Sequence, residues 1–547
     1  MEMLKSTKYI FLLVFSFALL SLQSSFAQDT LDVPQGFATL NDAVSGDTTA
    51  TGEPQNLNRV WRLERGGWYI VNASLKTNAG SPLRIVAAEG DGHQPIIVSA
   101  VMEDIGAANR PFTPTGDAEF VDLYVSGIND LGEAARKNMF RLEGEGSRYV
   151  LDKCFFDHDA QAFIRQNAPG QKLFITNCIF RSAATVNDPW DGIMIASRGG
   201  YQDTIFVENN TFMVASNRFW QAYSGVMHNV TFNHNTFVQS GGVYDGNFET
   251  NRTVNLTVTN NLFMDISLEG DRTIIDGVTD TLVQEIFSVD SLFADSIATD
   301  EERSILFSNN VYGWSQEVKD YIAAHSDSLG FFQFHNPSTW AVINNFDGMV
   351  SENNLVETVV FTDAPDINKF VEYATDRLEF GGPYGRMDGL IDIRADRNGI
   401  DPIATGPETF GLSDNEYDLS YSNTHAAYSY STGSYPVGDL NWFPEVIVSV
   451  EDRGNKSLAP TEFSLGQNYP NPFNPATSIQ FVIPESGVVT LSVHNLIGEK
   501  VAELINEELP SGSYEYNFDA SSLSSGIYFY SIKTNTFSQT KKMLLLK

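Results

Sequence analysis

The stretch VENNTFM, residues 207–213, has a near copy in FNHNTFV, residues 232–238. Both place an asparagine, a small or branched residue and an aromatic residue in the same order. Further segments align with these two without gaps, so the chain repeats a six-residue pattern. The aligned segments are LDKCFF (151–156), ITNCIF (175–180), VENNTF (207–212), FNHNTF (232–237), VTNNLF (258–263) and FSNNVY (307–312).

The spacing of the repeat predicts its architecture. Successive fourth positions lie 24, 32, 25, 26 and 49 residues apart, which indicates units of about 25 residues with one insertion and one gap that can hold two units. Short β-branched and aromatic runs between Asn and Gly favour a coil of parallel strands, one coil per unit. The fourth position holds Cys154, Cys178, Asn210, Asn235, Asn261 and Asn310.

Stacking gives each position of the repeat a structural role. Neighbouring coils lie about 4.8 Å apart, so an inward asparagine can donate its amide to the asparagine of the next coil. We expect its tolerance of left-handed backbone to form the bend, and the aromatic residue to stack in the core. Cys154 and Cys178 would adjoin in this ladder. A disulfide between them is one alternative. The torsion that a disulfide requires is awkward for side chains stacked in parallel, so we favour a reduced pair.

The repeat resembles that of the right-handed parallel β-helix proteins related to pectate lyases. The resemblance covers roughly residues 35–315 and rests on the Asn-Asn-x-Phe segments. It implies an all-β, right-handed parallel β-helix. It does not imply a reaction, because one fold carries many functions.

The N-terminus predicts export. Residues 1–27 combine Lys5 and Lys8 with an apolar run and end in Ser-Phe-Ala, which is typical of a secretory signal peptide. A membrane anchor is the alternative, but the run is short for a span. No later segment is apolar enough to cross a membrane, so we expect no transmembrane segment in the mature chain.

The charge excludes some partners. The chain has 34 Lys and Arg against 69 Asp and Glu, a formal charge of −35. An acidic surface repels nucleic acid and anionic membranes, so we expect no nucleic-acid partner.

Flanking segments should close the coil. We assign residues 28–450 to the β-helix domain, with a capping region of helices and loops at about 314–445. Apolar spacing predicts helices at 314–325 and 363–378, the second with Asp363 as N-cap and Pro365 in its first turn. Residues 412–445 should wrap the coil. The segment SENNLVE (351–357) imitates the repeat, but its neighbourhood does not read as strand.

A polar linker at 451–460 leads to a separate tail, residues 461–547. Alternating strands between Gly, Pro and Ser turns predict a small antiparallel, immunoglobulin-like β-sandwich. The motifs NYPNPFNPATSI, VHNLIGEKV, SSGIYFYSI and KKMLLLK resemble the type A C-terminal sorting domain of the type IX secretion system. The resemblance implies recognition by the type IX machinery and removal of the tail. The protein is then secreted or attached to the outer-membrane surface.

The strand and loop after each repeat segment hold the candidate site residues. Arg165 and Arg198 precede the next fourth position by 13 and 12 residues, so we expect them nearly stacked, as candidate catalytic residues. Carboxylates at Asp159 and Asp191 are candidate Ca²⁺ ligands. Candidate substrate-binding residues are Asp157, His158, Trp190, Arg218, Trp220 and Tyr244.

Two functions stay open. We favour an exported protein that binds extracellular polysaccharide without catalysis. The alternative is a polysaccharide lyase-like enzyme acting on uronate polymers, in which a basic residue removes the proton next to the carboxylate. Guanidinium groups suit uronate carboxylates, but ordinary coil surfaces also carry Arg, Asp and Tyr. The segment DIRADRNGID (392–401) lacks the full ligand spacing of a calcium loop.

Overall fold

The computed structural model describes residues 29–47, 55–76, 82–100, 110–129, 138–159, 161–183, 191–222, 225–241, 247–268, 285–292, 298–325, 333–379 and 417–444, the short pieces 274–275 and 278–279, and most of 464–545. The chain divides into two compact units, one comprising Phe26–Val448 and the other containing Ser449–Lys547. Each is described by itself below. The expected signal peptide (1–27), linker (451–460) and segment 392–401 lie outside the described residues.

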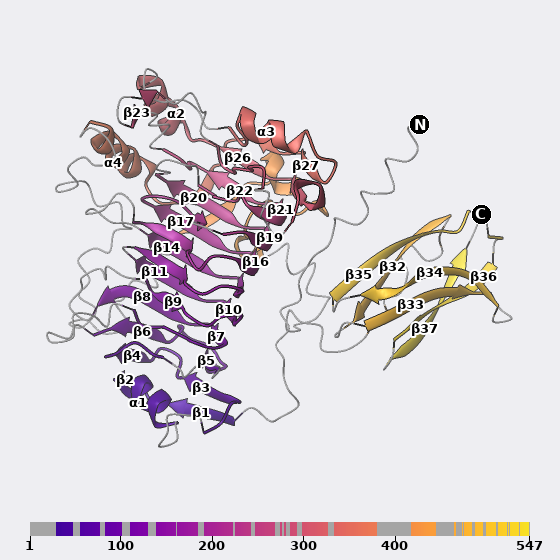
Figure 1. Cartoon of the computed structure of the whole chain (residues 1–547), viewed down its shortest axis with the longest axis horizontal. Coiled ribbons are helices and arrows are strands. Elements are labelled where there is room, and N and C mark those ends of the chain that lie inside the picture. Colours follow the sequence, from indigo (N-terminus) through magenta and orange to yellow (C-terminus); the bar gives the residue numbers. More distant parts are fainter. Residues whose placement is uncertain are drawn as a thin grey trace. The chain divides into compact units, whose positions relative to one another are not determined.

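The larger unit is a parallel β-helix, which confirms the expected fold (Figure 1). Its first sheet stacks eleven parallel strands in chain order. They are β1 (Asp29–Val33), β3 (Arg59–Leu63), β5 (Leu83–Ala87), β7 (Ala118–Val121), β10 (Arg148–Asp152), β13 (Lys172–Thr176), β16 (Gln202–Glu208), β19 (Met227–Asn233), β21 (Thr253–Thr259), β25 (Ser304–Ser308) and β27 (Met349–Glu352).

The second sheet also has eleven parallel strands, each following one strand of the first sheet. They are β2 (Gly36–Phe37), β4 (Trp68–Val71), β6 (Ile96–Ser99), β8 (Tyr124–Asn129), β11 (Phe155–Asp159), β14 (Ile179–Ala183), β17 (Thr211–Ala215), β20 (Thr236–Ser240), β22 (Leu262–Met264), β26 (Val311–Gly313) and β28 (Leu355–Val356).

A shorter third sheet completes the middle coils. Single-residue bridges at Phe112, Phe248 and Phe287 continue its stacking on both sides. It contains β9 (Phe140–Leu142), β12 (Ala162–Gln166), β15 (Ile193–Ser197) and β18 (Trp220–Ala222).

An asparagine ladder runs through the bend between the first and second sheets. The Oδ1 atom of Asn235 accepts from the backbone N–H (3.1 Å) and the Nδ2 (2.9 Å) of Asn210 in the preceding coil. Asn261 and Asn310 repeat both bonds with similar distances. Asn354 extends the ladder, because its Oδ1 accepts from Asn310 Nδ2 at 2.8 Å. The segment 351–357, which the sequence left out of the repeat, is therefore a further coil.

The bend itself is made by the residue before the ladder position, which corrects our expectation. These residues have left-handed φ angles of 51 to 60°, whereas the ladder asparagines do not. Asparagine tolerates this conformation because its short polar side chain bonds locally. The bend residues are Lys153, Asn177, Asn209, His234, Asn260, Asn309 and Asn353.

Cysteine takes the ladder position in two coils. Cys154 and Cys178 are free and buried. Cys154 N–H contacts Cys178 Sγ at 3.4 Å, and Cys178 N–H donates to Asn210 Oδ1 at 2.8 Å. Thiols therefore replace the first two amides of the ladder.

Aromatic rings fill the interior beside the ladder. Phe156, Phe180, Phe212, Phe237 and Phe263 stack with ring centroids 4.7 to 5.1 Å apart. All are buried in one continuous core cluster. Each ring needs a neighbour above and below, so a single coil could not bury its own ring.

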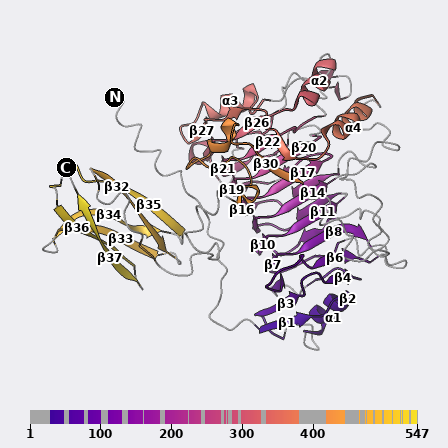
Figure 2. The ribbon, with the colours of Figure 1, turned by 180° about the vertical axis from the view of Figure 1, so that it is seen from behind.

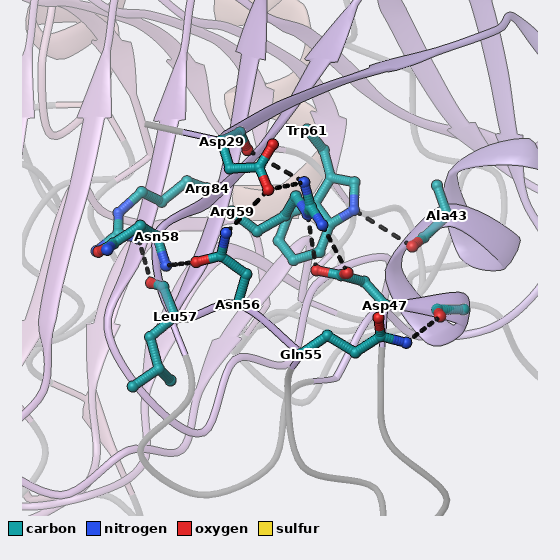
Figure 3. Close-up of polar contacts among 11 residues, drawn as sticks. Asp29, Ala43, Asp47, Gln55, Asn56, Leu57, Asn58, Arg59, Trp61 and Arg84 are labelled. Carbon is teal, nitrogen blue, oxygen red and sulfur yellow. Dashed lines mark hydrogen bonds and ion pairs between the residues drawn. The ribbon is translucent and has the colours of Figure 1, made fainter. Parts of the chain in front are cut away.

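The N-terminal end is closed by helix α1 (Thr39–Gly46) (Figure 3). The Arg59 guanidinium forms ion pairs with Asp29 at 2.8 Å and Asp47 at 2.9 Å, so it joins β1 to the end of α1. Trp61 Nε1 donates to the Ala43 carbonyl at 3.3 Å. Charged residues on β1, the edge strand, also discourage pairing with other chains.

The opposite end and the outer face of the second sheet are covered by later segments (Figure 2). They include α2 (Gln316–Ala324), α3 (Pro337–Ile343) and α4 (Ile367–Glu379). The second expected helix starts later than predicted, because Asp363 ends β29 (Phe361–Asp363), which pairs with β30 (Asp418–Tyr421). Short elements here and nearby are η2 (Asp300–Glu302), β23 (Ile274–Ile275), β24 (Val278–Thr279), η4 (Ala426–Ser429) and η5 (Leu440–Trp442).

The smaller unit consists of two antiparallel sheets around one apolar core, as expected for the tail. One sheet has the order β31 (Ser464–Leu465), β32 (Ala476–Ile483), β35 (Gly512–Asp519). The other has the order β34 (Lys500–Leu509), β33 (Gly487–His494), β36 (Gly526–Lys533), β37 (Ser538–Leu545).

Candidate functional site

The outer face of the third sheet carries arginines on neighbouring coils. Phe140 and Ile164 point into the core, so Arg141 and Arg165, the next residues along β9 and β12, point outward. The register pairs Arg141 directly with Arg165. Two guanidinium groups therefore lie one strand spacing apart on this face.

Two further arginines join this pair. Arg198 follows the end of β15, in the coil after Arg165, and Arg110 lies two residues before the bridge residue Phe112. Burial lowers the pKa of Arg165, and the positive charges of Arg198, Arg141 and Arg110 lower it further. Burial and the charge of Arg141 likewise lower the pKa of Arg110. We call these four residues the arginine row.

Carboxylates and neutral groups both act on the arginine row. Glu143 lies 2.7 Å from Arg141, and the charge of Asp191 acts on Arg165. Neutral groups also bond the row: Arg165 donates to Asn167 Oδ1 at 3.1 Å and Arg198 donates to Gln221 Oε1 at 3.1 Å. The row thus gathers four positive charges on a chain of net charge −35.

The row adjoins a small buried apolar cluster. Ala162, Ile193 and Ala196 form this cluster, which is separate from the main core, and Ala196 pairs in register with Arg165. Charged groups beside apolar atoms interact more strongly with an anion than they would in open water. The arginine row can therefore hold a ligand that offers anionic groups.

The candidate metal ligands Asp159 and Asp191 lie near each other but face differently. Asp159 pairs in register with Ala183, a core residue, so its side chain points to the interior. Its Oδ1 accepts from Gln161 N–H at 2.8 Å. Burial raises the pKa of Asp159 well above its usual value, and the charge of Asp191 adds to this. Among the described residues, no three His, Cys, Asp or Glu side chains are grouped as metal ligands.

Asp157 and His158 lie on the second sheet, away from the row. Asp157 is buried and accepts from Tyr124 Oη at 2.6 Å and from Arg181 Nη2 at 2.9 Å. His158 Nδ1 lies 2.5 Å from the same carboxylate. The Arg181 guanidinium covers the Phe155 ring at 4.9 Å. These contacts make a closed ion cluster, in which Asp157 presents no exposed surface to a ligand.

The remaining candidates are enclosed or undescribed. Trp220 is fully buried against Phe232, so its ring presents no surface to a sugar. Arg218 is also buried and forms an ion pair with Glu249. Trp190 and Tyr244 lie outside the described residues.

The structure thus brings Arg165 and Arg198 together and adds two arginines that the sequence reasoning missed. Arg141 precedes Cys154 by 13 residues, the same offset as Arg165 before Cys178. That offset was the available signal for Arg141. Arg110 gives no such signal. The register of its coil is set by the bridge between Phe112 and Phe140, and Arg110 lies two residues before Phe112, at a position that does not correspond to Arg141.

Comparison with known proteins informs the tail. Residues 467–546 match the family described as secretion system C-terminal sorting domain. No curated protein matches the chain significantly. Within the described part of the chain, no helix combines the length and apolarity needed to span a bilayer. The two-sheet fold of the tail and this match together identify residues 467–546 as a type IX secretion sorting domain, through which the protein is exported to the cell surface or the medium.

Proposed function

We propose that the exported β-helix binds an anionic extracellular polysaccharide along the arginine row. The observation that carries the proposal is the accumulation of four guanidinium groups, on neighbouring coils, in an acidic protein. Like charges repel, so such a grouping costs stability unless an anion binds it.

The chemistry of the row favours carboxylate or sulfate groups on sugars. Guanidinium presents a planar fork of N–H donors that matches a carboxylate with two parallel hydrogen bonds. Coil stacking places the forks of Arg141 and Arg165 about 4.8 Å apart, so neighbouring acid groups of a linear polymer can engage both arginines at once.

Titration with defined polysaccharides tests the proposal. We expect the exported protein to bind polygalacturonate or alginate, but not dextran, and to lose affinity as salt increases. The double variant Arg141→Gln, Arg165→Gln should bind at least about tenfold more weakly, since each charge-assisted bond contributes about 1.5–3 kcal/mol. Arg62→Gln is the matched control, because Arg62 is paired with Asp32 on the first sheet.

The outcomes separate clearly. Equal affinity of the double variant and the control variant would show that the arginine row is not part of the binding site. Binding of dextran as tightly as polygalacturonate would replace the anionic ligand with a neutral one. Thermal unfolding of each variant checks that the coil remains folded.

A polyuronate lyase is the second candidate. The lowered pKa of Arg165, which results from burial and from its arginine neighbours, favours a guanidine that can accept a proton. Neighbouring guanidinium groups would stabilise the enolate that forms. Incubation with polyuronates should then produce the ultraviolet absorbance of an unsaturated uronate, and Arg165→Gln should abolish it. Binding without this product supports the non-catalytic function.

Processing belongs to the same proposal. We expect the signal peptide to be removed at the inner membrane and the tail at the outer membrane, after which the β-helix is released or attached to the surface. Mass spectrometry of protein recovered from both fractions should find neither residues 1–27 nor residues 467–546. Detection of the tail in the mature protein would contradict its removal.

A further inference from the structure

Residues 417–444 form a strap that docks on the bend of the β-helix. Leu440 N–H donates to Asn209 Oδ1 at 2.7 Å, and Gly438 N–H donates to the Asn260 carbonyl at 2.8 Å. Gly438 has a φ of 96°, and a Cβ there would lie 2.4 Å from Thr236 Oγ1. The strap therefore approaches the coils too closely for any other residue at this point.

Asp439 is buried where the strap meets the second sheet. Its Oδ2 accepts from the Thr211 hydroxyl at 2.7 Å, and its Oδ1 accepts from Asn441 N–H at 2.9 Å. Its own N–H donates to Thr236 Oγ1 at 2.9 Å. Among the described residues, no positively charged side chain contacts the Asp439 carboxyl group. Burial raises the pKa of Asp439 from 3.8 to about 7.

His234 lies half-buried on the other side of the same contact. It occupies a bend position at which the preceding and following coils have Asn209 and Asn260. Its Nδ1 lies 3.2 Å from the carbonyl of Gly438, the residue before Asp439. A neutral imidazole donates one N–H to such a carbonyl. Burial lowers the pKa of His234 from 6.5 to about 4.

The other titratable groups nearby are held differently. Glu208, at the end of β16, accepts from Asn233 Nδ2 at 2.6 Å, within the coils. At the far end of the strap, Glu357 faces His425 at 3.3 Å and accepts from Ala427 N–H at 2.8 Å. Neither carboxylate bonds the Gly438–Asp439 segment. Among the described residues, Asp439 and His234 are therefore the acid and the base that take part directly in the contact between the Gly438–Asp439 segment and the coils.

The geometry points to a closure in which Asp439 and His234 exchange a proton when the strap opens, so that docking stays nearly independent of pH in mildly acidic surroundings. When docked, Asp439 is buried and His234 is half-buried, and between about pH 4 and 7 both groups are neutral. When the strap opens, the carboxyl loses one proton and the imidazole gains one. The open and docked states then hold the same number of protons, and pH does not shift the balance between them.

Each group alone has the opposite sign. The buried acid stabilises docking at low pH and weakens it as pH rises from about 4 to 7, because the open state releases a proton. The buried imidazole weakens docking as pH falls from 6.5 to about 4, because the open state binds a proton. The two slopes cancel between about pH 4 and 6.5.

Hydrogen exchange of the strap amides in the full-length protein tests this closure. Protection factors of the Gly438, Asp439 and Leu440 N–H groups would be measured from pH 5.0 to 6.5, each corrected for intrinsic exchange. The wild type should vary less than about threefold. The protection of Asp439→Asn should rise about fifteenfold from pH 5.0 to 6.5, and that of His234→Asn should fall about twentyfold, because each slope approaches tenfold per pH unit only between the two pKa values of its group. Asparagine suits position 234, since neighbouring coils use it there.

Two further variants complete the test. The double variant Asp439→Asn, His234→Asn should again be flat. Glu357→Gln is the control, which should lower protection at the other end of the strap without giving a slope here. Slopes of the same sign in the two single variants, or flat profiles in both, would overturn the proposal. If the strap of one single variant fails to dock, the sign of the pH dependence of protection in the other variant still tests the proposal.

Discussion

The asparagine ladder and the arginine row are both built by stacking coils, but they differ in regularity. The ladder repeats one residue type at one position, and each amide is buried and bonded to the next. The row gathers four arginines from unequal positions, and Arg198 and Arg110 fall outside the register of Arg141 and Arg165. Strict repetition therefore marks the interior that holds the coils together, whereas the irregular row marks the surface that we assign to ligand binding.

The ladder should fail first when one member is changed. Asn210→Leu removes an oxygen that accepts from Cys178 N–H and an amide that donates to the Ile175 carbonyl and to Asn235. Each buried group left unbonded costs about 1–3 kcal/mol, so we expect a loss of about 3–5 kcal/mol in the free energy of unfolding, measured by urea denaturation.

An asparagine outside the ladder is the matched control. Asn255 donates to Asn229 Oδ1 at 3.0 Å on the outer face of the first sheet and stays partly exposed. Water can replace its bond, so Asn255→Leu should cost less than about 1 kcal/mol. Equal losses for the two variants would mean that neither burial nor ladder position makes the Asn210 amide more stabilising than an amide on the outer face.

The same contrast explains what the sequence could predict. The repeat specified the β-helix, the ladder residues and the aromatic stack, because stacking imposes identical demands on every coil. It missed the coil at Asn354, since the two strands of this coil, β27 and β28, are short and lie between the helical segments α3 and α4. We expected Trp220 on the surface, but its side chain lies in the core. Trp220 follows the ladder residue Asn210 by ten positions, and this position falls on the inward face of the third sheet.

The site was less predictable than the fold. Arg165 and Arg198 were found from their offsets, but their grouping with Arg110 depends on loop lengths that differ between coils. The buried partners of Asp157, which are Tyr124 and Arg181, come from coils on either side of it. Such contacts depend on how neighbouring coils align, and no local sequence pattern around Asp157 predicts them.

Completing the ladder should stabilise the coil. Cys178→Asn would place an amide between Cys154 and Asn210, where its oxygen can accept from Cys154 N–H and its nitrogen can donate to Asn210 Oδ1. We expect a gain of about 1 kcal/mol in the free energy of unfolding. Cys178→Val, which is similar in size but cannot form these bonds, should lose stability. A loss in both variants would show that this part of the core fits a thiol and no amide.

The smallest effect concerns the charge around the arginine row. Glu143 pairs with Arg141 and competes with any anionic ligand, so Glu143→Gln should raise the affinity for polygalacturonate about twofold to threefold at low salt. Glu119→Gln is a close control, because Glu119 lies 3.9 Å from Arg84 on the first sheet and its side chain is 31% exposed, against 32% for Glu143. Both variants change the net charge equally, so they separate local from overall electrostatics. The gain should disappear in high salt, which screens exposed charges. An equal gain in affinity for both variants would show that the net charge of the protein controls binding and that the arginine row contributes nothing specific.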